Sequence, residues 1–137
     1  MLVLEEYERA KARGAKRAVM LPVSAPFHCA LMAPAADVMD KALSDVSFGV
    51  PTVPVVPNVR AQACSDPTEL RALLVEQITG AVRWRESVLA MRAHGVESFV
   101  ELGGKVLGPM VGRIDKDAQV ASLVTMADLE AFAKEIA

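Results

Sequence analysis

One stretch of the sequence, LPVSAPFHCALM at residues 21–32, concentrates residues that could do chemistry, with His28 near its middle. Pro22 and Pro26 hold their own φ angles at about −65° and favour extended backbone just before them, which predicts that a strand ending near Val23 leaves its sheet here. His28 then lies on a loop before a helix. An imidazole there suits a general base, because it exchanges a proton near neutral pH. A lone histidine is more often structural or solvated, so the spacing alone leaves both interpretations open.

Further stretches accompany this motif, and their order along the chain is informative. They are GAKR at 14–17, PTVPVVPNV at 51–59, VEQITGAVRW at 75–84 and ELGGKVLGPM at 101–110. From about Lys11 to the end of the chain, their order and spacing resemble the malonyl-CoA:acyl carrier protein transacylases of fatty-acid synthesis. The resemblance implies an α/β fold, the C-terminal part of a three-layer acyltransferase core with a mainly parallel sheet. It assigns residues 24–137 to this core and residues 1–23 to the last helix and strand of an inserted ferredoxin-like subdomain.

The resemblance also implies an activity, the transfer of a malonyl group from coenzyme A to acyl carrier protein through a serine-bound acyl intermediate. In that family, a histidine in the motif matched by His28 is the base of the serine. The serine stands in a Gly-x-Ser-x-Gly turn, and no serine of this chain has a glycine two residues away on both sides. We therefore expect the chain to supply the base but not the nucleophile, and to be inactive alone.

Other site candidates come from the same resemblance. The backbone carbonyl of Gln77 is expected to orient His28, although by its type alone this glutamine is simply a polar residue near a helix end. Asn58 is expected to line the site. Lys16 and Arg17 are candidates for docking the strongly acidic acyl carrier protein, although adjacent basic residues are more commonly just solvated.

Composition restricts other functions. A net charge of −2 and an isoelectric point of about 5.7 give no reason to expect nucleic acid or a membrane surface as a partner. No apolar run approaches the roughly 18 residues of a transmembrane helix, and Glu5, Glu6 and Glu8 stand where a signal peptide would be basic. A cytoplasmic location is therefore expected. No histidine or cysteine spacing suits a metal site, and no cofactor is expected.

The apolar content supports an alternative to catalysis. Hydrophobic residues make up 53% of the chain, and the mean hydropathy is +0.30. A part of a larger sheet would keep the apolar residues that its missing neighbours cover, and such exposed patches favour association. The alternative interpretation is a catalytically inactive fragment, or a partner-binding module, that binds another protein or itself through apolar surface.

Local patterns predict strands alternating with helices, as in an α/β layer with mainly parallel strands. Helices are predicted at residues 4–13, 31–43, 67–78, 83–93, 106–114 and 126–136, and strands at 17–23, 50–59, 96–102 and 120–124. The strand at 50–59 is expected at a sheet edge or near a bend, because its three prolines cannot donate to a ladder. The apolar stripe of the helix at 31–43 is expected to be core. Asp66, Pro67 and Glu69 are expected to begin the next helix as N-cap, first-turn proline and capping-box partner.

Overall fold

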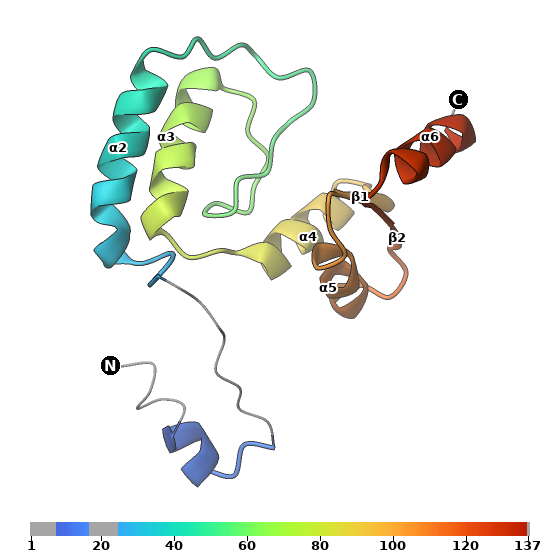
Figure 1. Cartoon of the computed structure of the whole chain (residues 1–137), viewed down its shortest axis with the longest axis horizontal. Helices are drawn as coiled ribbons and strands as arrows, with labels where there is room; N and C mark the ends of the chain where they lie inside the picture. The colour runs from blue at the N-terminus through green and yellow to red at the C-terminus, as the bar shows by residue number, and fades with distance from the viewer. Residues whose placement is uncertain (1–7, 17–24, 137) are drawn as a thin grey trace.

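The computed structural model describes residues 8–16 and 25–136 of the chain, and residues 25–136 form two parts (Figure 1). We call residues 25–80, which hold two α-helices and a long loop, the helix-pair region. Residues 81–136, which hold two strands and three helices, are the strand-pair region. In the N-terminal segment residues 8–12 are helical, within the helix predicted at 4–13, and Gly14 follows them with a φ of 80°. The strand predicted at 17–23 lies outside the described residues.

Two adjacent helices build the helix-pair region. A short 3-10 turn, η1 (Ala30–Met32), leads into α2 (Ala33–Ser44), and α3 (Pro67–Thr79) packs beside α2. The side chain of Asp66 caps α3 by accepting the backbone N–H of Glu69 at 2.7 Å, as predicted. The predicted role of Glu69 as the capping-box partner is wrong. Its carboxylate instead pairs with Arg60 and accepts a hydrogen bond from the Cys64 thiol at 3.1 Å.

Arg71 ties the two helices together. Its guanidinium donates to the backbone carbonyls of Leu43 at 3.1 Å and Asp40 at 3.0 Å, and to the Asp40 carboxylate at 2.9 Å. The last carbonyls of a helix have no partner within the helix. Arg71 therefore satisfies the C-terminal end of α2 from the side of α3.

The strand predicted at 50–59 is wrong. In this loop only Val55 pairs, through a single antiparallel bridge in which it exchanges two backbone hydrogen bonds with Cys64 at 2.9 and 2.8 Å. Pro51, Pro54 and Pro57 lack the N–H that a ladder requires, so the pairing does not extend. The loop is nevertheless anchored, because Val59 packs against the buried cluster of Cys64, Leu70 and Leu73.

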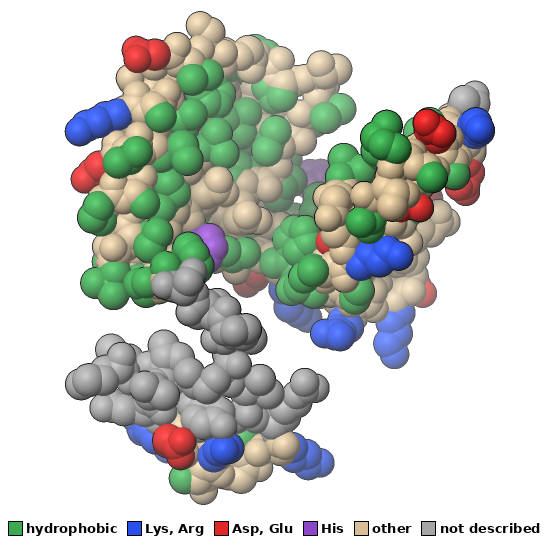
Figure 2. All heavy atoms as spheres, in the orientation of Figure 1, with side chains coloured by type: hydrophobic (Ala, Val, Ile, Leu, Met, Phe, Trp, Pro, Cys, Tyr) green, Lys and Arg blue, Asp and Glu red, His purple; other side chains and the backbone are tan. Residues whose placement is uncertain are grey.

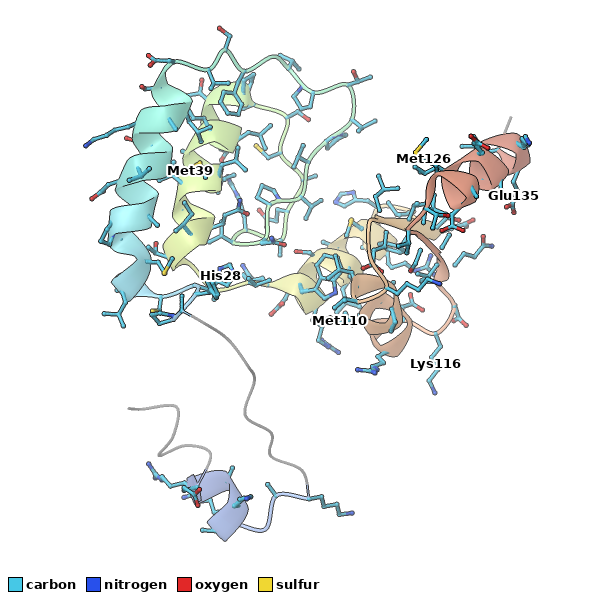
Figure 3. The ribbon with its side chains drawn as sticks, viewed as in Figure 1. His28, Met39, Met110, Lys116, Met126 and Glu135 are labelled. Carbon is cyan, nitrogen blue, oxygen red and sulfur yellow. The ribbon has the colours of Figure 1, made fainter. Side chains whose placement is uncertain are left out.

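The prediction that the apolar stripe of the helix at 31–43 is core is also wrong. No residue of α2 is buried, and the side chains of Val38 and Met39 are 68% and 40% exposed. Figure 2 shows a broad hydrophobic face over the helix pair, and Figure 3 places Met39 within it. The stripe is exposed because only α3 and η1 contact α2 among the described elements.

The strand-pair region follows the predicted order closely. Its elements are α4 (Trp84–Ala93), β1 (Ser98–Leu102), α5 (Leu107–Ile114), β2 (Gln119–Leu123) and α6 (Met126–Glu135). β1 and β2 pair in parallel, from Ser98 opposite Gln119 to Leu102 opposite Leu123. Parallel strands need a crossover, which α5 provides. The predicted α/β organisation is therefore confirmed here, with each bound within two residues of its expected position.

One carboxylate joins three elements of this region. Glu101 on β1 accepts the backbone N–H groups of Val106 at 2.8 Å, Leu107 at 2.9 Å and Gly108 at 2.8 Å, and the hydroxyl of Ser122 on β2 at 3.1 Å. These hydrogen bonds, chiefly those from Leu107 and Gly108, lower the pKa of Glu101 to about 2. An ionised Glu101 thus holds the start of α5 against both strands.

Candidate active site

His28 lies in a tight turn with an unusual backbone conformation. Its φ is 58°, in the left-handed region that residues other than glycine rarely adopt. On either side, the N–H of Phe27 donates to the carbonyl of Ala25 at 2.9 Å and the Cys29 thiol donates to the carbonyl of Pro26 at 3.0 Å. These two hydrogen bonds stabilise the turn that carries the His28 side chain.

The imidazole of His28 meets the end of α3. Its Nδ1 lies 3.0 Å from the backbone carbonyl oxygen of Gln77, 49 residues later in the chain. A carbonyl oxygen only accepts hydrogen bonds, so Nδ1 must be the donor. In the neutral imidazole, Nε2 is then the unprotonated nitrogen. His28 is exposed, and Figure 3 shows it at the foot of the helix pair.

The helix end explains why this carbonyl is available. Gln77 lies in the last turn of α3, where the final carbonyls have no N–H partner within the helix. The carbonyl of Glu76 accepts the N–H of Gly80 at 2.9 Å, whereas the carbonyl of Gln77 accepts His28. The position therefore acts through its backbone, and the glutamine side chain is not required for the contact.

Asn58 and Lys16 make no hydrogen bond or ion pair with His28 or Gln77 within the described residues. Asn58 lies in the turn at 58–60, its carbonyl accepts the N–H of Arg83 at 2.8 Å, and its side chain makes no hydrogen bond to His28 within the described residues. Lys16 is exposed, and Arg17 lies outside the described residues. The roles of Asn58, Lys16 and Arg17 stay predictions, as does the boundary between residues 23 and 24.

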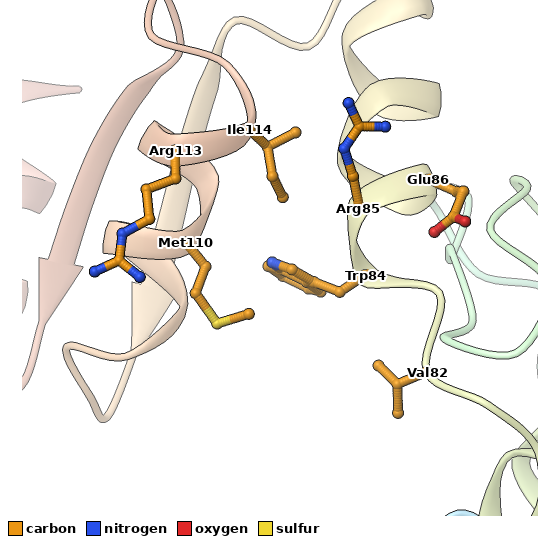
Figure 4. A pocket seen from close by; sticks show the side chains of 7 residues that line it. All are labelled: Val82, Trp84, Arg85, Glu86, Met110, Arg113 and Ile114. Atoms are coloured by element: carbon orange, nitrogen blue, oxygen red, sulfur yellow. The ribbon is translucent and has the colours of Figure 1, made fainter. Parts of the chain in front are cut away.

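A second feature was not foreseen from the sequence. A pocket of about 380 Å³ opens between α4 and α5, and Trp84 lies at its centre in Figure 4. The indole nitrogen is buried and has no hydrogen-bond partner within the described residues. Arg85 and Arg113 line the same pocket from different helices. No sequence motif links Arg85 and Arg113, so only the structure shows that they line the same pocket.

The described part of the chain holds neither a metal-ion cluster nor a membrane-spanning helix. Across residues 8–16 and 25–136, no group of three or more histidine, cysteine, aspartate or glutamate side chains is placed to hold a metal ion. None of the helices in these ranges is long and apolar enough to cross a membrane.

Comparison with known proteins places the chain. A malonyl CoA-acyl carrier protein transacylase of Salmonella typhimurium is 46% identical over 132 residues, which are 93% of this chain and 43% of the relative. One of Bacillus subtilis is 40% identical over 110 residues, 80% of this chain and 35% of the relative. No protein-family model matches.

Solved structures agree with these relatives. An acyl-carrier-protein S-malonyltransferase from Bartonella henselae has a TM-score of 0.89 and 46% identity, over 98% of this chain and 43% of that chain. A malonyl-transacylase in complex with its type II polyketide synthase acyl-carrier protein has a TM-score of 0.87 and 38% identity, over 97% of this chain and 43% of that chain.

Fold and sequence together define the class of protein: the chain corresponds to part of an α/β acyltransferase. Within that class the chain belongs to the malonyl CoA-acyl carrier protein transacylases. It spans about 43% of the Salmonella typhimurium relative that it matches. The resemblance predicted from the motifs is thereby confirmed.

Proposed function

We propose that this chain supplies the general base for the transfer of a malonyl group from coenzyme A to acyl carrier protein. His28 is the base, and the nucleophilic serine comes from outside these 137 residues. One observation carries the proposal: the hydrogen bond from His28 Nδ1 to the carbonyl of Gln77 leaves Nε2 free to accept a proton. The relatives named above, which are malonyl CoA-acyl carrier protein transacylases, support the choice of reaction.

The proposed reaction has two half-reactions that use the same nitrogen. In the first, Nε2 of His28 takes the proton of the serine hydroxyl while the oxygen attacks the malonyl thioester carbonyl. The carbon–sulfur bond breaks, and the coenzyme A thiol leaves with that proton. In the second, Nε2 takes the proton of the carrier protein's thiol, whose sulfur attacks the malonyl ester. The serine oxygen leaves and recovers the proton.

The Gln77 carbonyl has two tasks in this scheme. It fixes the tautomer of His28, which sets Nε2 as the acceptor in both half-reactions. It also stabilises the imidazolium that forms each time, because it accepts a hydrogen bond from the ring and belongs to the negative end of a helix dipole. No acidic side chain is needed for either task.

A second candidate function rests on the exposed apolar face. Leu31 and Val38 are 74% and 68% exposed on neighbouring parts of the helix-pair region. A chain with such a face binds another polypeptide readily. Under this alternative, the 137 residues act only as a partner-binding module and contribute nothing to catalysis.

A complementation experiment tests the proposal. The chain is mixed with a separately produced polypeptide that carries the upstream part of a transacylase, including its Gly-x-Ser-x-Gly turn, and malonyl transfer is measured. We expect transfer only in the mixture. His28→Asn should then lower the rate by about 10²- to 10⁴-fold, because general acid–base catalysis contributes that much.

The choice of variants separates chemistry from folding. Asparagine tolerates the left-handed conformation better than alanine does, so His28→Asn keeps the turn while removing the base. His94→Asn is the matched control, because His94 is exposed at the end of α4 and far along the chain from the turn. Full transfer by the His28→Asn mixture would contradict the proposed base. A stoichiometric malonyl adduct on the chain alone would contradict the missing nucleophile.

A further inference from the structure

Gly80 follows the last residue of α3 in an ordinary extended conformation. Its φ of −84° and ψ of 157° are open to every residue type, so its backbone angles do not require a glycine. The space around it does, because a Cβ at this position would lie 2.6 Å from a methyl carbon of Val59. Of the eight glycines, all within the described ranges, Gly80 would bring a Cβ closest to a neighbouring atom. The missing side chain therefore allows a close approach between the end of α3 and Val59.

Val59 has little freedom to move away from an added methyl group. Its β-branched side chain has few favourable rotamers, and it packs against the buried cluster beside α3. The same Cβ at Gly80 would also lie 3.1 Å from the carbonyl oxygen of Glu76 in the last turn of α3. A methyl group at Gly80 must therefore displace either Val59 from this cluster or the last turn of α3 from Val59.

The turn that carries Val59 is itself fixed. The N–H of the buried Ala61 donates to the carbonyl of Pro57 at 3.1 Å, and the N–H of Arg83 donates to the carbonyl of Asn58 at 2.8 Å. Figure 1 shows the long loop that includes this turn returning beside α3. The last turn of a helix, in contrast, lacks part of its hydrogen bonds. The end of α3 is therefore the part that an added methyl group would displace.

This end of α3 holds the partner of the candidate base. Gln77 lies three residues before Gly80, and its carbonyl oxygen accepts the hydrogen bond from Nδ1 of His28 at 3.0 Å. No other hydrogen bond to the His28 ring is made among the described residues. A hydrogen bond weakens steeply as its angle and distance depart from the optimum. A shift of the last turn of α3 would therefore release the ring from its fixed tautomer.

We propose that Gly80 is a positioning residue for His28. Because Gly80 has no side chain, the last turn of α3 rests directly on Val59, and this close approach holds the Gln77 carbonyl where Nδ1 can donate to it. Gly80 acts through Gln77 and not on the substrate. The effect on catalysis rests on the proposed function of His28, whereas the effect on the tautomer does not.

The tautomer of His28 is a measure that a loss of stability alone does not change. Protonated and unprotonated imidazole nitrogens have well-separated nitrogen-15 chemical shifts, so NMR of the 137-residue chain, at a pH where the ring is neutral, shows which nitrogen carries the proton. The chain has only two histidines, and the spectrum of His28→Asn assigns their signals. We expect the Nδ1–H form in the unaltered chain and a clear loss of this form in Gly80→Ala.

Variants of Val59 separate the steric overlap from a loss of packing. The double variant Gly80→Ala with Val59→Ala lacks the methyl carbon that the new Cβ would meet, so it should recover the Nδ1–H form. Val59→Ala alone weakens the core but does not push on α3, so it should keep this form. Gly49→Ala is the matched control for an added methyl group, because no atom lies within 4 Å of a Cβ at Gly49.

The complemented enzyme links this geometry to the rate. Gly80→Ala should lower kcat by about 10- to 100-fold with little change in KM, because a small displacement of a catalytic group slows the reaction without weakening substrate binding. Adding Val59→Ala should restore most of the lost kcat. Gly49→Ala should leave both constants unchanged.

Three results would overturn the positioning role of Gly80. They are an unchanged His28 tautomer in folded Gly80→Ala, an equal loss of the Nδ1–H form in Gly49→Ala, and failure of the double variant to recover that form. Circular dichroism checks the helix content of every variant first. If Gly80→Ala does not fold, the double variant decides, because it must fold and keep the Nδ1–H form.

The two measurements together separate this proposal from the proposed function. Transfer that requires His28 but is unaffected by Gly80→Ala would contradict only the role of Gly80. Tautomers that respond as expected, without transfer in any mixture, would contradict only the proposed function.

Discussion

The helix-pair and strand-pair regions hold their shape by different means. In the helix-pair region the decisive contacts join distant residues: Arg71 reaches Asp40, and His28 reaches Gln77 across 49 residues. In the strand-pair region Glu101 collects three backbone N–H groups from residues five to seven positions later, and one hydroxyl from the paired strand. The second region is thus held by a polar network centred on one carboxylate.

The difference bears on function. The candidate base belongs to the helix-pair region, where α2 has no buried residue although Leu70 and Leu73 of α3 are buried. The strand-pair region carries no candidate catalytic residue, yet it encloses the buried side chains of Val88, Val111 and Leu123. Under the proposed function, His28 therefore lies in the region whose exposed apolar surface another part of the enzyme could cover.

Removing a core side chain of the helix-pair region should have the largest effect. Leu73 is 6% exposed in the cluster with Cys64 and Leu70. Leu73→Ala should cost about 2–4 kcal/mol, because it removes buried methyl groups and leaves a cavity. Hydrogen exchange should show lost protection in α2 and α3 while β1 and β2 keep theirs.

The neighbouring leucine provides the control for this prediction. Leu74 is 37% exposed, so Leu74→Ala should cost less than about 1 kcal/mol. An equal loss of protection in both regions for Leu73→Ala would break the comparison, since it would show that the two regions unfold together.

Adding one methyl group at Gly108 in the strand-pair region should lower the free energy of unfolding by less than Leu73→Ala does. A Cβ at Gly108 would lie 2.8 Å from the hydroxyl of Ser122 and 2.9 Å from a methyl of Val120. Gly108→Ala should therefore cost about 1–3 kcal/mol in urea unfolding, because the contact between α5 and β2 is overpacked. Gly112→Ala on the same helix has no atom within 4 Å of its Cβ, and it should be neutral or stabilising. Equal effects of the two substitutions would contradict a tight contact at Gly108.

The charge of Glu101 should make stability depend on pH. The pKa of Glu101 is lowered from 4.5 to about 2 by its hydrogen bonds, so the unfolded chain binds its proton first as pH falls. The contribution of Glu101 is complete above about pH 5 and is lost between about pH 5 and about pH 2. Glu101→Gln should lower stability at pH 7 and reduce the difference between pH 7 and pH 3.

The pH dependence of the stability of Glu101→Gln also distinguishes the contribution of the Glu101 hydrogen bonds from a general effect of acid. The pKa values of Asp115 and Asp128 are also lowered, chiefly by hydrogen bonds from Arg92 and Thr125 respectively. Some acid dependence should therefore remain in Glu101→Gln. An unchanged difference between pH 7 and pH 3 would contradict the role of Glu101 in holding α5 to the strands.

Short-range signals made much of the fold predictable. Asp66 and Pro67 marked the start of α3, and the order of elements from α4 to α6 followed from local residue patterns. The strand expected at 50–59 failed because apolar content outweighed the missing N–H groups of three prolines. The buried stripe expected on α2 failed because periodicity identifies an apolar face without identifying what covers it.

The sequence by itself determined the family and the α/β alternation, and it singled out His28 as the candidate base, because motifs, helix caps and periodicities are properties of neighbouring residues. The resemblance also predicted that the Gln77 carbonyl meets His28, as the structure shows. Only the tertiary structure set the φ of 58° in the turn of His28 and placed Arg85 and Arg113 around Trp84. Such meetings depend on how helices pack over long separations in the chain, and local patterns of residues do not encode them.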